Sequence, residues 1–417
     1  MILKRIFQII LLILAGEAVF ILPFVLTRIF RPTVLEVFAL SNTELGACFS
    51  IYGLVAMVSY VLGGGLADRF APRYLIAAAL VLTAAGGFYL ASYPSFEELL
   101  VLYGYWGFTT IFLFWAAMVK ATRIWGGSDK QGLAFGLLDG GRGAVSYLFG
   151  VAGIVVFYYF SGTQIEYVNL ADRKESFSQV IYFCSIVILI IAVLAALFVS
   201  NPKKEVSKSS ERILDTLKNY VKVLRIPAVY LLMIIILCGY SGYKITDVYS
   251  LYANEIMGYN EVKAAKVGAN MLGIRIFIGV IAGLLADRFT SGRMMLSGFL
   301  VTFLGALLFA LGWVQDGDFI FFLIAIISTA VGVYAIRTLY FAAVQEGNIP
   351  LAVTGTAVGV ISLLGYTPDV FMGPLIGYFL DGYPGLVGFQ LVFASLAGFS
   401  IIGAITSWLF MRLKKQT

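Results

Sequence analysis

Residues 64–70 read Gly-Gly-Leu-Ala-Asp-Arg-Phe, and residues 283–289 read Gly-Leu-Leu-Ala-Asp-Arg-Phe. A second pair of matching stretches follows further along the chain, with Gly-Leu-Ala-Phe-Gly at 132–136 and Gly-Thr-Ala-Val-Gly at 355–359. Two independent matches at nearly the same offset indicate that the chain consists of two related halves.

The composition around these repeats is that of a membrane protein. Hydrophobic residues make up 60% of the 417 residues and charged residues 12%, whereas about a quarter of the residues of a soluble domain are charged. The mean hydropathy is +0.93. A bilayer core about 30 Å thick takes about 20 helical residues to cross, so the chain has room for about a dozen spans.

Apolar runs bounded by charged or turn residues predict twelve transmembrane helices. The first run follows Lys4 and Arg5 as a signal peptide would, but it is too long for one and contains Glu17, so we interpret it as the first span. The sequence therefore predicts an all-α membrane protein with twelve transmembrane helices in two pseudo-symmetric six-helix bundles. The predicted spans are about 6–27, 45–66, 74–92, 99–119, 133–160, 178–200, 228–253, 267–286, 294–314, 319–344, 354–380 and 386–411.

The distribution of positive charge predicts the orientation. An even number of spans places both termini on one side, and most Lys and Arg residues of the loops then share that side, which marks it as cytoplasmic. We expect a multi-pass protein of the cytoplasmic (inner) membrane with both termini in the cytoplasm.

One long basic insert separates the sixth and seventh spans. It predicts an N-terminal bundle over 1–200, a cytoplasmic basic linker over 201–227 and a C-terminal bundle over 228–417. We interpret the insert as a solvated linker with an amphipathic surface helix, and a regulatory or lipid-sensing role is the alternative.

Several kinds of site are excluded or disfavoured by residue usage. The chain has no histidine, which excludes His-dependent catalysis. Cys48, Cys184 and Cys238 fall in apolar segments without paired spacing, which argues against a disulfide framework and a metal site. We expect no enzymatic activity, no cofactor and no metal, and a monomer whose partners are a small-molecule substrate, protons and membrane lipids but no nucleic acid.

The two repeated stretches resemble the inner-loop signature of the major facilitator superfamily, G-x-L-a-D-r-x-G-r-k, and the likeness covers nearly the whole chain. The resemblance implies a gating motif in which Asp68 and Asp287 accept hydrogen bonds from the N-terminus of a neighbouring helix or pair with an arginine. Simple turn chemistry is the alternative. The matching residues are Gly64, Leu66, Asp68, Arg69 and Arg73 in the first copy and Gly283, Leu285, Asp287, Arg288 and Arg293 in the second.

Other stretches resemble the organophosphate and organic-anion branches of the superfamily. In organophosphate antiporters an arginine on helix 1 and one on helix 7 grip the phosphate, and this chain has Arg28 and Lys244 near those places. Because Arg28 lies near the outer end of its span, we expect its side chain to snorkel to the surface. The stretches are Asp68-Arg69 with Pro72-Arg73, Arg123-x-Trp125 ahead of 132–136, and Gly355-Thr356-Ala357.

Charged residues inside the predicted spans are the candidates for function, because each costs about 2.5–3.5 kcal/mol on insertion scales. The superfamily fold implies that helices 1, 4, 7 and 10 line a cavity, that 2, 5, 8 and 11 flank it, and that 3, 6, 9 and 12 face lipid. The charges avoid this last set. They are Glu17, Asp139, Arg142, Lys244, Asp247, Arg275, Arg337 and Asp369.

We predict that the substrate-binding residues are Arg337, Arg275, Lys244, Arg142 and Tyr243. For Arg337 an interhelical salt bridge is the alternative. Tyr240 and Tyr249 are further candidates for hydroxyls in the cavity, although core packing is the favoured interpretation of these tyrosines.

For proton coupling we predict Glu17, Asp139 and Asp369. A carboxylate near the bilayer centre can load and release a proton, while Glu17 could instead make an interhelical hydrogen bond or contact a substrate cation. Asp369 follows Pro368 and precedes Gly373-Pro374, where we expect a kinked helix.

Two pairs, Asp139 with Arg142 and Lys244 with Asp247, are i,i+3 neighbours that could neutralise each other on one helix face.

These patterns predict a secondary active transporter that moves an organic anion, a sugar phosphate or a zwitterion by alternating access, as a proton symporter or an anion antiporter. An exporter of amphipathic drugs or lipids is the rival within transport. A membrane sensor without transport activity is the alternative from another class.

Overall fold

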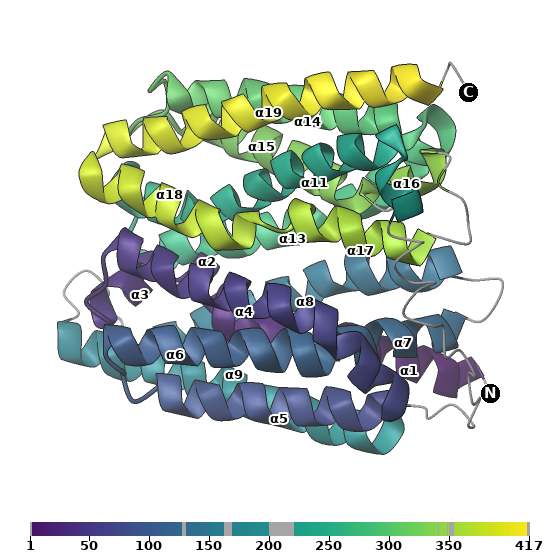
Figure 1. The fold of residues 1–417 in the computed structure, drawn as a ribbon. Coiled ribbons are helices and arrows are strands. Elements are labelled where there is room, and N and C mark those ends of the chain that lie inside the picture. The colour runs from purple at the N-terminus through teal and green to yellow at the C-terminus, as the bar shows by residue number, and fades with distance from the viewer. Residues whose placement is uncertain are drawn as a thin grey trace. The chain divides into compact units, whose positions relative to one another are not determined.

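The computed structural model describes residues 2–126, 131–161, 169–199, 221–340, 342–347, 349 and 354–414, and within these ranges the regular structure is helical (Figure 1). The first part of the chain contains α1 (Ile2–Phe20), η1 (Ile21–Val25), α2 (Leu26–Ile29), α3 (Arg31–Val37), α4 (Asn42–Arg69), α5 (Pro72–Leu90), α6 (Phe96–Gly107), η2 (Phe108–Trp115), α7 (Ala116–Gly126), α8 (Gln131–Ser161) and α9 (Leu170–Phe198).

The second part contains α11 (Pro227–Ile245), η4 (Thr246–Val248), α12 (Tyr249–Glu255), α13 (Glu261–Phe289), α14 (Ser291–Ala310), α15 (Phe319–Leu339), α16 (Ala342–Glu346), α17 (Thr354–Gly365), α18 (Pro368–Gly382) and α19 (Leu386–Lys414). The predicted linker is described only from residue 221 onward, so most of its predicted surface helix lies outside the described residues.

Eleven described helical segments are long and apolar enough to cross a bilayer. The remaining predicted span, the eighth, falls in α13, which is 29 residues long but carries Glu261, Lys263, Lys266, Arg275, Asp287 and Arg288. At 1.5 Å per residue its length exceeds the thickness of the hydrocarbon core. The prediction of an all-helical polytopic membrane protein is confirmed.

Local sequence explains where the helices start. Ser41 and Glu44 form a reciprocal capping box at the beginning of α4, and Ser95 and Glu98 do the same for α6. Proline occupies the first position of α5 and α11, where its missing N–H costs nothing. These signals fix the register at which the apolar faces begin.

Within the described residues the first, fourth, seventh and eleventh spans are interrupted in the predicted membrane region, the fourth by the π-helical segment η2 (Phe108–Trp115). The first widens into the π-helical turn η1, which contains Pro23. The seventh passes through the 3₁₀ turn η4 between α11 and α12. The eleventh breaks between α17 and α18 just before Pro368, so the predicted kink is confirmed. Broken helices in transporters present backbone and charged groups at membrane depth.

Packing divides the chain into two compact units, each described here by itself. Unit 1 comprises Met1–Lys203, Asp247–Ile276 and Gly373–Gly382, and unit 2 comprises Lys204–Thr246, Phe277–Met372 and Tyr383–Thr417. The predicted division at 201–227 stays a prediction. In unit 1 a continuous apolar core joins α1, α4, α5 and α9, and in unit 2 α14 packs along both α15 and α19.

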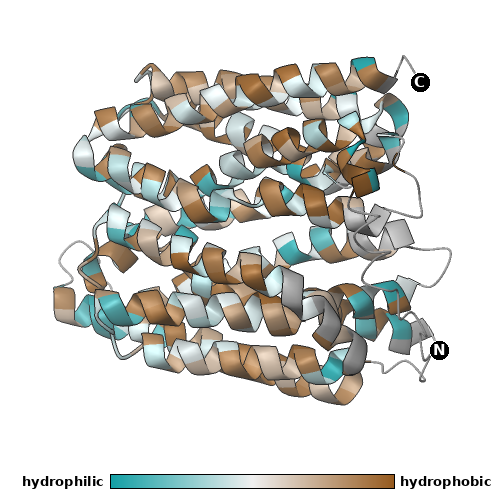
Figure 2. Cartoon of the chain, viewed as in Figure 1, coloured by the Kyte–Doolittle hydropathy of each residue, from teal (hydrophilic) through white to brown (hydrophobic). Residues whose placement is uncertain are grey.

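Hydrophobic residues cover most helices along their length, and hydrophilic residues concentrate toward helix ends and a few interior positions (Figure 2). On α9 one face exposes Ile186, Ile190, Val193 and Leu197, and α19 exposes Ile401, Ile405 and Leu409 in the same manner. Exposed apolar faces of this kind suit contact with lipid. The three cysteines are buried and free, as expected of small core residues.

Candidate functional site

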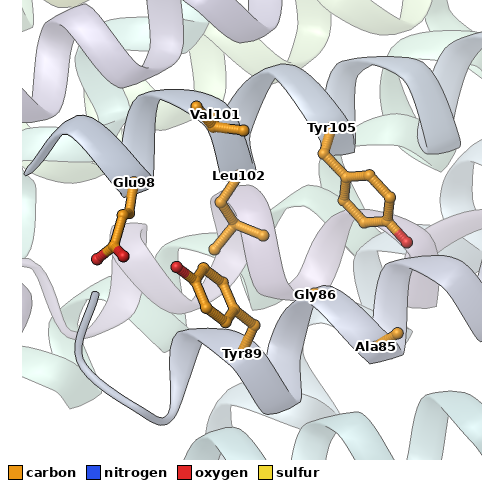
Figure 3. A pocket seen from close by; sticks show the side chains of 7 residues that line it. All are labelled: Ala85, Gly86, Tyr89, Glu98, Val101, Leu102 and Tyr105. Atoms are coloured by element: carbon orange, nitrogen blue, oxygen red, sulfur yellow. The ribbon is translucent and has the colours of Figure 1, made fainter. Parts of the chain in front are cut away.

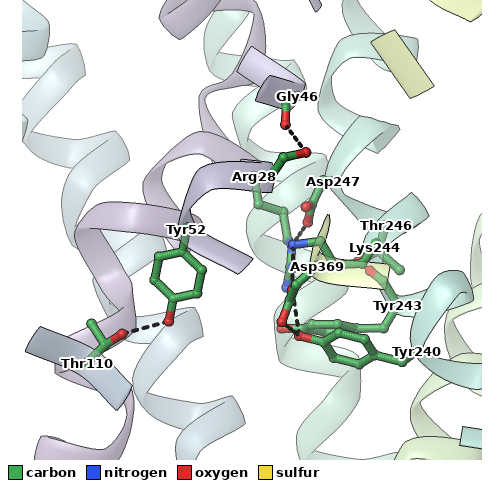
Figure 4. Close-up of polar contacts among 11 residues, drawn as sticks. Arg28, Gly46, Tyr52, Thr110, Tyr240, Tyr243, Lys244, Thr246, Asp247 and Asp369 are labelled. Atoms are coloured by element: carbon green, nitrogen blue, oxygen red, sulfur yellow. Dashed lines mark hydrogen bonds and ion pairs between the residues drawn. The ribbon is translucent and has the colours of Figure 1, made fainter. Parts of the chain in front are cut away.

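Side chains from α11, α15 and the α17–α18 break meet in unit 2. We name this group the Tyr-Lys-Arg cluster, and its members are Tyr240, Tyr243, Lys244, Arg337, Tyr366 and Asp369. Figure 4 shows Tyr240, Tyr243, Lys244 and Asp369. It brings together four residues predicted for binding or coupling, namely Tyr243, Lys244, Arg337 and Asp369.

The carboxylate of Asp369 is the centre of this cluster. Lys244 Nζ lies 3.3 Å from its Oδ1, and the Tyr240 hydroxyl donates to Oδ1 and Oδ2 at 3.0 and 3.2 Å. The Tyr240 ring stacks on Tyr243 at 5.7 Å and meets Tyr366 edge-on at 4.8 Å. One cation and one hydroxyl therefore hold the carboxylate within an aromatic wall.

Arg337 enters the cluster from α15. Its guanidinium carbon lies 3.7 Å from the centre of the Tyr243 ring, a cation–π arrangement. Stacking on a ring leaves the N–H edges of a guanidinium in the plane where a carboxylate or phosphate binds through two parallel hydrogen bonds.

The sequence of α11 explains how these groups reach each other. Tyr240, Tyr243 and Lys244 have i, i+3, i+4 spacing and so share one face. A Cβ at Gly239 would lie 2.7 Å from the Ile336 side chain, and one at Gly242 would lie 3.1 Å from Val333. The two glycines let α11 and α15 approach closely, which brings Arg337 over Tyr243.

A second charged group lies in unit 1, where Glu17 of α1 meets α8. Arg142 Nε donates to Glu17 Oε2 at 2.8 Å, and the Ser146 hydroxyl donates to Oε1. The Arg142 guanidinium also lies over the rings of Phe20 and Trp115, at 5.3 and 5.9 Å. Both carboxylate oxygens thus have donors, and the cation is covered by aromatic rings.

Asp139 and Arg275 form another ion pair of unit 1, with Arg275 Nη2 donating to Asp139 Oδ1 at 2.7 Å. The two partners differ in exposure, because the Arg275 side chain is 3% exposed and that of Asp139 is 39% exposed. The acid is therefore far more accessible than the base.

The expectation that Arg28 snorkels is wrong. Arg28 is 2% exposed, and its guanidinium forms an ion pair with Asp247 (Figure 4). The turn η1 and the interruption at η4 bring α2 and the start of α12 together, and the Ser250 hydroxyl donates to the Arg28 carbonyl at 2.8 Å. A guanidinium with a nearby carboxylate does not need to reach water.

The i,i+3 neighbours have close ion-pair partners on other helices. Asp139 pairs with Arg275, Arg142 with Glu17, Lys244 with Asp369, and Asp247 with Arg28. Of the tyrosines, Tyr249 is fully buried in unit 1, which favours its packing alternative.

A shallow groove between α5 and α6 lies away from these groups. Figure 3 shows its lining by Ala85, Gly86, Tyr89, Glu98, Val101, Leu102 and Tyr105, which does not include the predicted site residues. Within the described part of the chain, no group of three or more Cys, Asp and Glu side chains could hold a metal ion.

A family model described as Major Facilitator Superfamily matches residues 10–368. The chain belongs to the Major Facilitator Superfamily. It is therefore a secondary transporter with a small-molecule substrate, and not an enzyme.

Relatives of similar length occur in Escherichia coli K12. The inner membrane protein YqcE is 28% identical over 397 residues, which cover 94% of this chain and 90% of YqcE. The inner membrane protein YihN is 25% identical over 415 residues, which cover 97% of this chain and 95% of YihN. The names of these relatives state no branch of the superfamily, so the resemblance to the organophosphate branch stays a prediction.

Solved structures share the superfamily fold. A bacterial homologue of the human lysosomal transporter Spinster, in an inward-facing and unoccupied conformation, aligns with a TM-score of 0.76 at 16% identity over 99% of this chain and 98% of that one. The nucleoside transporter NupG aligns with a TM-score of 0.72 at 14% identity over 98% and 99%. At these identities the likeness shows the fold alone.

The superfamily's gating signature is described only in part. The side chains of Asp68, Arg69 and Asp287 are not described, and neither are the surroundings of Gly64 and Gly283. Arg73 donates to the Tyr74 hydroxyl and lies over its ring at 4.5 Å, Arg288 lies over the ring of Phe289, and Arg293 is exposed.

Two residues near the signature were missed by the sequence analysis. Glu346 Oε1 accepts from the backbone N–H of Ser291 at 2.6 Å and so caps the start of α14. Lys120 Nζ donates to the Ala67 carbonyl at 2.6 Å near the end of α4. Both lie just beyond predicted spans, where a charged residue is expected in a loop. The left-handed turn at Thr290, with φ of 80°, has no sequence signal such as glycine.

Proposed function

We propose that this transporter carries a small organic anion or zwitterion across the inner membrane and that the Tyr-Lys-Arg cluster binds its acidic group. The observation that carries the proposal is that one aromatic cluster holds two cations, Lys244 and Arg337, together with one carboxylate, Asp369. The acidic group of a solute that enters this cluster would meet both cations.

The environment suits such a ligand. Lys244 is buried, whereas Tyr240, Tyr243, Arg337 and Asp369 are partly exposed, so a solute could reach them without unfolding the unit. A partly desolvated guanidinium binds carboxylate or phosphate more strongly than it does in water.

Proton coupling would arise because Asp369 and the solute anion compete for the ammonium group of Lys244. In the substrate-free cluster Asp369 acts as an internal anion beside the ammonium group. A solute anion that takes its place leaves Asp369 without its cation, and a proton taken up by Asp369 would remove that cost. This favours proton symport over exchange of anions. Asp139, the more exposed acid of unit 1, is the second proposed proton carrier.

Glu17 fits proton coupling less well than these two acids. Protonation of Glu17 would weaken two contacts at once, the ion pair with Arg142 and the hydrogen bond from Ser146. We therefore propose that Glu17 stays charged and supports the packing of α1 on α8.

The inner membrane location is supported by the names of the two Escherichia coli relatives, and the cytoplasmic placement of both termini by the positive charge of the loops on that side.

The test is uptake by the purified protein in lipid vesicles. Counterflow of labelled sugar phosphates, sugar acids and amino acids should identify one anionic or zwitterionic class, and a pH gradient with an acidic exterior should drive its accumulation. Accumulation driven only by a preloaded anion would replace symport by exchange. Transport restricted to hydrophobic cations or lipids would reject the proposal in favour of the exporter.

A further inference from the structure

One end of unit 1 joins segments that are far apart in the sequence through contacts that the proposed binding cluster does not use. Asp381, at the end of α18, accepts from the backbone N–H groups of Asn42 and Thr43 at 3.1 and 2.7 Å. It also accepts from the Asn42 side-chain amide at 3.2 Å. A carboxylate from the end of the chain thus caps the helix that begins the second span.

This cap adds to one that α4 already has. Within the capping box, Ser41 Oγ accepts from the Glu44 N–H and Glu44 accepts from the Ser41 N–H. The local box leaves the N–H groups of Asn42 and Thr43 for Asp381, so the carboxylate meets the positive end of the helix dipole. The first turn of α4 is therefore completed only when α18 lies against it.

Glycines permit that approach. A Cβ at Gly377 would lie 2.5 Å from Thr43 Cα, and a Cβ at Gly373 would lie 2.7 Å from the Gly46 carbonyl oxygen. Gly373, Gly377 and Asp381 are spaced four residues apart, so they lie along one face of α18. We call this contact between α4 and α18 the seam. Because the backbones touch at these glycines and Asp381 caps α4 beside them, the two helices can pack here in only one register.

Arg31 of α3 is hydrogen-bonded to Asn42, which is part of the seam. Its Nε and Nη2 donate to Asn42 Oδ1 at 3.3 and 2.9 Å, so the Asn42 amide links the arginine on one side with Asp381 on the other. Burial lowers the pKa of the Arg31 guanidinium, and nearby carboxylates, among them Asp247 and Asp381, raise it. The charge of Asp381 therefore also helps to stabilise a buried cation.

A second seam lies at the same end of unit 1. There the Arg28–Asp247 ion pair joins α2 to η4, and a Cβ at Gly268 would lie 3.1 Å from the Arg28 carbonyl. Positive-inside reasoning assigns this end to the outer face of the membrane.

We propose that Asp381 is a positioning residue for the transport cycle, a latch that holds the outer ends of α4 and α18 together and breaks when the transporter opens outward. The sequence predicted an acid that caps a neighbouring helix at the inner face, in Asp68 and Asp287, and Asp381 has that geometry at the other face. Asp381 is exposed, so water can replace its partners when the seam separates, which makes the latch reversible.

The test measures opening without any substrate, so its result is independent of the proposed function. In a background with Cys48, Cys184 and Cys238 replaced by alanine, Ser50→Cys reports on the face of α4 one turn beyond Gly46. A membrane-impermeant maleimide is added to intact cells and, separately, to inverted vesicles. We expect Asp381→Asn to raise the labelling rate from the outside about tenfold, with Asp381→Glu close to the parent and the exposed control Asp316→Asn unchanged.

A second variant covers the case in which Asp381→Asn folds poorly. Gly377→Ala forces α18 away from Thr43 while keeping the carboxylate, and it should also raise outside labelling. Unchanged labelling in a folded Asp381→Asn protein overturns the proposal, whether or not transport is lost. An increase confined to inverted vesicles overturns it as well, because the seam would then lie at the inner face.

Discussion

The Glu17–Arg142 pair of unit 1 and the Lys244–Asp369 pair of unit 2 have the same chemistry in different surroundings. The first has a contact of 2.8 Å and a serine on the second carboxylate oxygen, and its side chains are 4% and 9% exposed. The second spans 3.3 Å, and its carboxylate is 13% exposed. The Glu17–Arg142 pair is therefore the more buried of the two, and we call it the sealed pair. In the Lys244–Asp369 pair, which we call the looser pair, a solute anion could take the place of the Asp369 carboxylate.

One fold therefore holds charged pairs for two purposes. Burial of the sealed pair costs desolvation free energy, which the attraction between its two side chains offsets. Removal of either side chain is therefore strongly destabilising. A looser pair beside a stacked arginine places two cations, Lys244 and Arg337, in one cluster that is partly exposed. The following predictions test this contrast, beginning with the largest effect.

Breaking the sealed pair should cost the most stability. Arg142→Gln leaves Glu17 charged and buried without its cation, a change that typically costs about 3–5 kcal/mol. We expect a large fall in the thermal unfolding temperature of the purified protein in detergent, while the exposed control Lys266→Gln has little effect. Equal stability of Arg142→Gln and the control would contradict the sealed description.

The double variant Glu17→Gln with Arg142→Gln sharpens this result. It removes both charges, so it should recover most of the stability that either single change loses. Additive losses would mean that the two side chains act independently.

In the looser cluster, Arg337→Lys should weaken substrate binding by about tenfold or more, about 1.4 kcal/mol. Lysine keeps the charge but lacks the planar fork that binds an acid through two hydrogen bonds. Arg412 is a matched control, because it also lies 3.7 Å over an aromatic ring, that of Trp408, but near the end of the chain. Equal affinity in Arg337→Lys and Arg412→Lys would remove Arg337 from the binding site.

Replacing Asp369 by Asn should separate exchange from accumulation. The amide cannot take up the proposed proton, so accumulation driven by one pH unit should fall by up to about tenfold, while counterflow persists. Vesicle uptake with and without the gradient measures both. Retained pH-driven accumulation would assign coupling to another acid, with Asp139 the next to test.

The sequence predicted the spans and the broken eleventh helix because apolar length and Pro368 are local signals. It also identified the charged residues that matter, since each is costly in lipid. Their partners could not be predicted, because Glu17 and Arg142 are 125 residues apart and neighbours at i,i+3 competed as explanations. Asp381 was missed because it lies one residue beyond a predicted span, and only packing shows that it caps α4.

The smallest predicted effect concerns Tyr240, whose hydroxyl donates to both oxygens of Asp369. Without that hydrogen bond the Asp369 carboxylate is held less firmly and competes more freely with a solute anion for Lys244, so Tyr240→Phe should weaken substrate binding. A net hydrogen bond of about 0.5–1.5 kcal/mol sets the loss of affinity at about two- to tenfold. Tyr378→Phe, on the same helix but 61% exposed, should leave the affinity unchanged. Unchanged or tighter binding in Tyr240→Phe would indicate that Asp369 does not compete with the solute, and the two pairs would then differ in exposure but not in purpose.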